Sequence, residues 1–296
     1  MRSLGVLLAI AALAALGACL QSETRPAPGE VVYTLSGSAD ILGGVQSSDG
    51  WSIEFSRFLL AAQGVSTRES SGCDVSAIVD TPTLVDVRVP GEHEVNRALA
   101  TGECGFTYHI GPLAPRDLHD DREVEEWLGP GVTDEDLALV ESLTTGVYVE
   151  GKATKAGVTQ VFRWSFVAHD FCQPAFDEGA DEGAGATFRV GSGATERVDL
   201  AIRGDHLFFD RLEAGAEVRF DPIAGADTDP AYGNADGEVT REELSRVPLS
   251  AIERADGAYL AEAPVDLATW IYMLMDHTAY LGGTEACAPF DREDVR

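Results

Sequence analysis

The chain has 296 residues, of which 45% are hydrophobic and 24% are charged, so it is neither a disordered nor a collagen-like or coiled-coil sequence. It carries 21 Lys and Arg against 50 Asp and Glu, which gives a formal charge of −29 at pH 7. Such a surface repels nucleic acid and anionic bilayers. We therefore expect divalent cations or a basic protein surface as partners, and no nucleic acid.

The first residues have the pattern of a secretory leader. Arg2 precedes an uncharged apolar run from Leu4 to Leu16, which is too short for a transmembrane helix. The segment LGAC, which ends at Cys19, resembles the lipobox of bacterial lipoproteins, in which the cysteine is lipidated and becomes the new N-terminus. The alternative is an ordinary signal peptide with a chance cysteine.

This resemblance implies a signal peptide over residues 1–18, lipidation at Cys19 and a protein held on a membrane of the bacterial cell envelope by its N-terminal lipid. The residue after Cys19 is Leu20 rather than Asp, which by the same resemblance favours the outer membrane. Residues 19–30 are polar and contain two prolines, as expected for a flexible tether.

The four remaining cysteines predict disulfides, because an exported protein folds in an oxidising compartment. Three pairings are open. We favour Cys73 with Cys104, which flank one predicted strand pair, and Cys172 with Cys287. A Cys₄ zinc site is disfavoured, since zinc sites use close C-x₂₋₄-C pairs and no two of these cysteines are that near in sequence.

Residues 31–204 are dominated by alternation of apolar and polar side chains, the pattern of half-buried strands. Clear examples are residues 51–58, 84–90 and 197–204, and residues 147–166 read as a hairpin whose tight turn is Ala156–Gly157. The predicted fold is mainly β, an antiparallel β-sandwich.

Helical segments are expected in and after this β region. One covers residues 121–128, a second starts at Thr133, whose hydroxyl can cap it, and residues 176–187 form an acidic, glycine-rich loop. Residues 205–296 are predicted to be a helical C-terminal region with apolar residues at helical spacing in 265–282. The two regions can share one core, so the boundary near residue 204 is approximate.

One segment, residues 220–248, carries a recognisable chemistry. Its part DGEVTREEL resembles the second half of an EF-hand loop, which surrounds calcium with six to eight oxygen ligands and uses a glycine for its sharp turn. In that register Asp236 is position 5, Gly237 position 6, Val239 the apolar position 8, and Glu243 the bidentate position 12. The resemblance implies one calcium ion and the following candidate ligands: Asp227, Asp229, Asn234, Asp236, Glu238 (through its carbonyl), Thr240 and Glu243.

The first half of the loop departs from the family pattern. Counting back from Gly237 places Tyr232 where the first Asp belongs, so we treat residues 231–235 as an insertion and assign positions 1 and 3 to Asp227 and Asp229. Two variants stay open: Asn234 replacing one of these ligands, and a shorter insertion that starts from Asp229. An acidic turn that binds no ion is the competing interpretation. The flanks predict a short entering helix capped by Asp221 and an exiting helix over 240–247.

A second metal hypothesis uses softer ligands. His206, Met275 and His277 could bind copper, although methionine at helical spacing more often fills a core. The motifs GxSxG and HExxH and a P-loop are absent from the sequence. The leading hypothesis is a non-enzymatic, lipid-anchored envelope protein that binds calcium and, through its β domain, a partner; a copper-binding protein and a secreted hydrolase of unknown substrate are the alternatives.

Overall fold

The computed structural model describes residues 27–68, 72–80, 82–113, 128–167, 169–172, 187–212, 215–254, 257–258, 265–282 and 285–286. The predicted leader, Cys19, most of the helix predicted at 121–128, most of the acidic loop predicted at 176–187 and Cys287 lie outside these ranges. No helix among the described ranges is long and apolar enough to cross a membrane.

The described residues form sixteen strands, five α-helices and two 3₁₀ turns. The strands are β1 (Gly29–Gly37), β2 (Val45–Gln46), β3 (Ser52–Arg68), β4 (Cys73–Asp80), β5 (Thr83–Asp86), β6 (His93–Ile110), β7 (Val147–Lys155), β8 (Val158–Phe166), β9 (His169–Phe171), β10 (Thr187–Val190), β11 (Thr195–Ile202), β12 (Glu238–Val239), β13 (Glu253–Arg254), β14 (Gly257–Ala258), β15 (Ala279–Leu281) and β16 (Glu285–Ala286). The helical elements are α2 (Ala39–Gly43), α3 (Asp134–Leu143), η3 (Asp205–Phe208), α4 (Asp221–Thr228), α5 (Arg241–Leu244), η4 (Leu249–Ala251) and α6 (Leu267–Met275).

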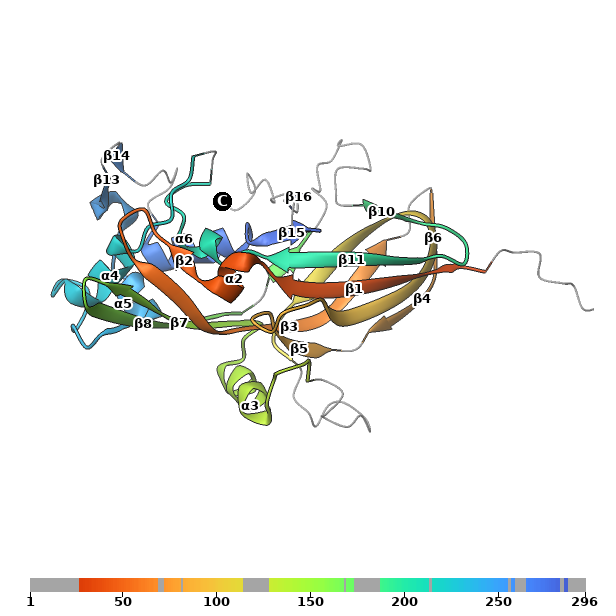
Figure 1. The fold of residues 1–296 in the computed structure, drawn as a ribbon, viewed down its shortest axis with the longest axis horizontal. Coiled ribbons are helices and arrows are strands. Elements are labelled where there is room, and N and C mark those ends of the chain that lie inside the picture. Colours follow the sequence, from red (N-terminus) through yellow and green to blue (C-terminus); the bar gives the residue numbers. More distant parts are fainter. Residues whose placement is uncertain are drawn as a thin grey trace, which may run out of the picture.

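The mainly β fold class is confirmed, but the strands do not form an all-antiparallel arrangement. Fourteen of them belong to one mixed sheet with the main order β12-β8-β7-β3-β6-β1-β11-β15-β16, in which β1 pairs with β11 and β8 with β12 in parallel. Both parallel pairs join segments that are far apart in the chain, where no tight turn imposes an antiparallel pairing. Figure 1 shows β1, β4, β6 and β11 towards one end of the molecule, and β7, β8, α4 and α5 towards the other.

The sheet curls so that it packs against itself. Tyr33 on β1 is in register with Asn96 in the first half of β6, yet its ring contacts Phe106 and Tyr108 in the second half, with centroids 6.1 and 5.9 Å apart. The two halves of β6 therefore face each other across an aromatic core. Gly102 lies between them at φ 111°, and a Cβ there would come within 1.7 Å of a backbone oxygen, so only glycine fits this bend.

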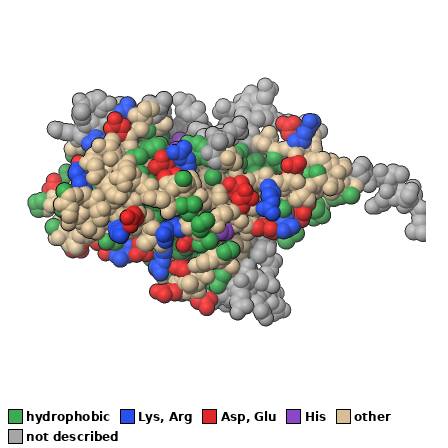
Figure 2. Space-filling model, in the orientation of Figure 1, with side chains coloured by type: hydrophobic (Ala, Val, Ile, Leu, Met, Phe, Trp, Pro, Cys, Tyr) green, Lys and Arg blue, Asp and Glu red, His purple; other side chains and the backbone are tan. Residues whose placement is uncertain are grey.

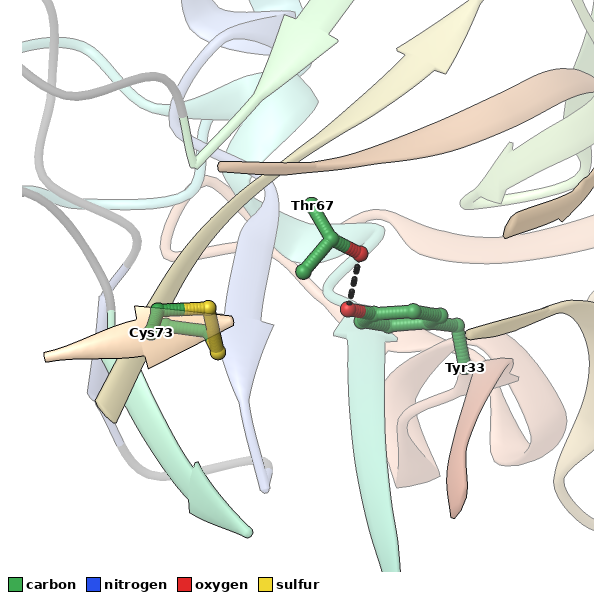
Figure 3. Close-up of a disulfide and its surroundings, with 4 residues drawn as sticks. Tyr33, Thr67 and Cys73 are labelled. Carbon is green, nitrogen blue, oxygen red and sulfur yellow. Dashed lines mark hydrogen bonds between the residues drawn. A yellow bond between two sulfur atoms is a disulfide. The ribbon is translucent and has the colours of Figure 1, made fainter. Parts of the chain in front are cut away.

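The disulfide Cys73–Cys104 is confirmed and joins β4 to β6 near this bend (Figure 3). In the same close-up, the Tyr33 hydroxyl lies 2.6 Å from Thr67 Oγ1, which links β1 to β3 across the core. Cys172 is also disulfide-bonded, while its predicted partner Cys287 lies outside the described residues.

Local sequence signals placed several elements correctly. The predicted hairpin is β7–β8, and its turn residues Ala156 and Gly157 have φ values of 50° and 84°, as a type I′ turn requires. Helix α3 begins after Thr133, whose hydroxyl accepts the Asp136 N–H while the Asp136 carboxylate accepts the Thr133 N–H. The apolar side of α3, with Leu137 buried, packs on the sheet.

Two boundaries differ from expectation. The sheet starts at Gly29, so the last two residues of the predicted tether belong to β1. The strand predicted over 84–90 ends at Asp86, because the carboxylate of Asp86 accepts the N–H of Arg88 and forms a turn there. Burial raises the pKa of the Asp86 carboxyl above its usual value.

The C-terminal region shares the core of the β region. Strand β15 pairs with β11, and Trp270, Leu274 and Met275 of α6 are buried in one apolar cluster with residues from β1 and β3. The region predicted to be helical thus contains short helices separated by strands.

Candidate functional site

The EF-hand-like segment lies at the edge of the sheet beside β8, between α4 and α5 (Figure 1). Pro222 stands in the first turn of α4, where its missing N–H costs nothing. Asp221 does not cap this helix as predicted, because it is the first helical residue. Its carboxylate instead accepts hydrogen bonds from Trp51 Nε1 at 2.7 Å and Lys155 Nζ at 2.6 Å.

Asp227 is the central residue of the segment. It lies in the last turn of α4 with only 1% of its surface exposed. Its Oδ1 accepts the N–H of Asp236 at 3.0 Å, and its Oδ2 accepts the N–H of Gly237 at 3.1 Å and Nε2 of Gln160 at 3.0 Å. The residues assigned to positions 1, 5 and 6 of the loop are thus in direct contact.

The inserted residues 231–235 form a compact turn of their own. The Asp229 carbonyl accepts the N–H groups of Tyr232 and Gly233, each at 2.9 Å, and the Asp227 carbonyl accepts that of Ala235 at 3.0 Å. The insertion leaves the main path of the loop and returns to it at Asp236. This geometry agrees with the register in which Asp227 comes first.

The second half of the loop is fixed on the sheet. Gly237 has φ 88°, the conformation expected at the sharp turn, and its carbonyl accepts the Val161 N–H at 2.9 Å. Val239 is fully buried, and its carbonyl accepts Trp164 Nε1 at 3.1 Å. Strand β12 therefore extends the edge of the large sheet, and this pairing orders the loop.

The remaining predicted ligands do not converge on Asp227. Among the residues that the structure describes, no three His, Cys, Asp or Glu side chains are placed to hold a metal. Asp229 Oδ1 accepts the Ala231 N–H, the two side chains of Asn234 and Asp236 bond to each other, and Glu238 pairs with Arg163 at 2.8 Å.

Glu243 is 4% exposed and caps α5. Its Oε2 accepts both the N–H and the hydroxyl of Thr240, each at 2.9 Å. These contacts use one carboxylate oxygen, and Oε1 makes no hydrogen bond within the described ranges. A bidentate contact with a cation would require the Glu243 side chain to turn towards Asp227.

Gln160 was not among the residues predicted from the sequence to belong to this site. It faces the core side of β8 together with Phe162 and Trp164, is 3% exposed, and donates to Asp227. Its Oε1 is buried and has no hydrogen-bond partner among the described residues. Amide and carboxylate oxygens are of the kind that calcium prefers, but Gln160 and Asp227 alone supply fewer than the six to eight oxygens it takes.

The softer candidate ligands have other contacts. His206 Nδ1 lies 2.8 Å from the backbone carbonyl of His277, and Met275 is fully buried in α6. The His206 ring stacks at 4.3 Å on Phe209 and meets Tyr280 edge-on at 5.3 Å. These contacts are those of a core histidine.

The unfolding free energy should decline as the pH falls from 7.5 to 5.5, because burial lowers the pKa values of His206 and His277. Below the ordinary imidazole value of about 6.5, the unfolded chain binds protons that the folded chain does not. The buried carboxyls of Asp86 and Asp199 have raised pKa values, which act in the opposite direction but at lower pH. Urea titrations across this range should show a shallower decline for the double variant His206→Asn/His277→Gln, and an unchanged slope would contradict the assignment.

No protein family, curated protein or solved structure matches the chain. The function of the chain is therefore inferred from its own residues and their contacts. Figure 2 shows Lys and Arg side chains interspersed with Asp and Glu on the face drawn, so the excess of acidic residues does not form one continuous patch there.

Proposed function

We propose that the chain is a cell-envelope protein, held by a lipid at Cys19 on what the leader suggests is the outer membrane, which binds calcium through residues 227–243. One observation carries the calcium assignment. Asp227 contacts Asp236 and Gly237, as expected if Asp227 is the first position of an EF-hand-like loop. The contact forms although Asp227 precedes Asp236 by nine positions. In this proposal the ion has a structural role, and the β region binds a partner with a basic surface.

A bound cation would complete a site in which the Asp227 carboxylate is already fixed by hydrogen bonds. Asp227 Oδ1 accepts one hydrogen bond, and a carboxylate oxygen has room for a second contact. Asp229, Asp236 and Glu243 lie on the same short segment and can supply further oxygens by side-chain rotation. A calcium site outside the cytoplasm needs an affinity of only about 10⁻⁴ to 10⁻³ M.

Calcium titration calorimetry should give heat with the wild-type chain and little or none with Glu243→Gln. The glutamine keeps an oxygen for the cap on α5, so the metal-free fold should persist. Ten millimolar calcium should stabilise the wild type by roughly 1.4 kcal/mol if its Kd is near 1 mM.

A matched control is Glu196→Gln, which removes an exposed carboxylate from β11, a strand that Figure 1 shows away from the end with α4 and α5. It should bind calcium like the wild type. Absence of heat from the wild type would rule out the calcium site, and metal analysis of protein purified without chelator would show whether copper is bound instead.

The membrane anchor has a separate test. Cys19→Ala should release the protein from the membrane fraction, because the acyl chains that hold it are attached at that cysteine. A Cys19→Ala protein that stays in the membrane fraction would contradict the lipobox assignment while leaving the calcium site untouched.

A further inference from the structure

Three side chains on adjacent strands form a hydrogen-bonded chain. Ser66 Oγ on β3 lies 2.8 Å from His109 Nε2 on β6, and His109 Nδ1 lies 2.9 Å from Asp170 Oδ1 on β9. A hydroxyl joined to an imidazole that is joined in turn to a carboxylate is the arrangement of an activated serine. The partners are 43 and 61 residues apart in sequence, so no local motif could reveal them.

The sheet places these groups on one outward face. Val65, Thr67 and Tyr108 are buried on the core side of β3 and β6, so Ser66 and His109 point to the opposite side. His109 is directly opposite Asp170 in the ladder. The side chains of His109 and Asp170 are 41% and 46% exposed, which leaves the imidazole within reach of a molecule in solution.

The tautomer follows from the carboxylate. A carboxylate oxygen accepts, so the tautomer that satisfies both contacts has His109 Nδ1 donating to Asp170 and Nε2 accepting the Ser66 hydroxyl. This is the protonation state in which histidine acts as a general base towards serine.

Thr107 adds a fourth polar group. It is directly opposite Ser66 in the β3–β6 ladder, so both side chains leave the same face of the sheet. Its Oγ1 is buried and has no hydrogen-bond partner among the described residues. Thr107 is 0% exposed, so its hydroxyl is closed to a substrate in solution, and the reactive groups of the site are Ser66, His109 and Asp170.

We propose that Ser66 and His109 are catalytic residues of a carboxylic-ester hydrolase site and that Asp170 positions His109. This activity goes beyond the proposed calcium binding and does not depend on it. The net charge of −29 disfavours anionic substrates, so the substrate class is a neutral or cationic ester.

The reaction needs only water as a second reactant. Ser66 Oγ attacks the ester carbonyl carbon while its proton passes to His109 Nε2, and the carbonyl oxygen becomes an oxyanion. The C–O bond to the alcohol then breaks, and the alcohol leaves with the proton from His109. Water attacks the acyl-Ser66 in the same way, which gives the carboxylic acid and restores the serine hydroxyl.

Two probes test the site in the purified chain: a fluorophosphonate, followed by mass spectrometry of the labelled peptide, and hydrolysis of p-nitrophenyl acetate. We expect one adduct on Ser66, absent from Ser66→Ala and His109→Ala, and a fall of about 10²-fold or more in hydrolysis by either variant. Asp170→Asn should reduce kcat and displace the acidic limb of the pH profile, which a purely structural contact would not do.

The matched control is Ser142→Ala, which removes an exposed serine hydroxyl from α3 and should leave labelling and hydrolysis unchanged. Folding of each variant is checked by its near-UV circular dichroism. Labelling of the wild type at other residues only, or equal hydrolysis by wild type and Ser66→Ala, would overturn the proposal. Calcium titration of the same samples keeps the two assignments separate, because either can fail without the other.

Discussion

Asp227→Ala is expected to lower the free energy of unfolding by roughly 3 to 5 kcal/mol, even without calcium. The Asp227 carboxylate is almost fully buried and accepts three hydrogen bonds, from the N–H groups of Asp236 and Gly237 and from Gln160 Nε2. The alanine variant removes both acceptor oxygens and leaves the three donors unpaired at the edge of the core, where each lost bond to a charged group costs about 1.5 to 3 kcal/mol. Some relaxation and water entry reduce the sum. Urea unfolding in the presence of EDTA measures the loss.

Asp229→Ala is the matched control, since Asp229 is exposed and its carboxylate accepts one local hydrogen bond, from the Ala231 N–H. It should change stability by less than about 1 kcal/mol. Asp227→Asn should fall in between, because the amide keeps one acceptor oxygen but turns an NH₂ towards N–H donors. Similar losses for Asp227→Ala and Asp229→Ala would contradict the central role of Asp227 in the loop.

A larger stability loss for Asp227→Ala than for Asp229→Ala would mean that Asp227 orders the loop in the absence of calcium. In the metal-free protein, the charge of Asp227 is balanced by backbone and amide donors, so the loop keeps its path before any cation arrives. Calcium would then bind to a partly formed site and would need to reorient only the side chains of Asp229, Asp236 and Glu243. The short strand β12 and its contact with β8 limit how far the backbone has to move.

Local features of the fold were predictable because short-range physics determines them. The β7–β8 turn needs two residues with positive φ, which Ala156–Gly157 supplies, and the start of α3 needs an N-cap, which Thr133 supplies. The Cys73–Cys104 pairing followed from the expectation that both cysteines flank one strand pair.

Long-range features were not predictable from these signals. The parallel pairing of β1 with β11 joins segments about 165 residues apart, and alternation of apolar side chains gives no information on which strands pair or in which direction. The bend at Gly102, which turns one long sheet into two facing layers, has no distinct local signature beyond the glycine itself.

The two candidate sites also differ in whether local sequence could reveal them. The loop could be recognised because its residues are contiguous, and the insertion at 231–235 only shifted the register. Ser66, His109 and Asp170 come from three separate strands, and Gln160 comes from a fourth. Only the register of the folded sheet brings such side chains together, so their sequence context alone contains no motif.

Removal of the Cys73–Cys104 disulfide should cost about 3 to 4 kcal/mol. The two cysteines are 31 residues apart, and closing a loop of that length removes this much conformational entropy from the unfolded chain in the chain-entropy treatment. The expected site of weakening is β4, because within the described residues its ladder partner is β6 alone. Cys73 and Cys104 are buried, and alanine at both positions places no polar group in the core.

The double variant Cys73→Ala/Cys104→Ala measures this effect under oxidising conditions. Its urea midpoint should fall, while the slope of the unfolding free energy against urea concentration changes little. Amide hydrogen exchange should become faster in residues 73–80. The β7–β8 hairpin, which lies towards the other end of the molecule, should keep its local protection relative to global unfolding (Figure 1). If exchange in β4 stays as slow as in β7 and β8, then the strand is held by its packing rather than by the disulfide, and the entropy argument for this bond is wrong.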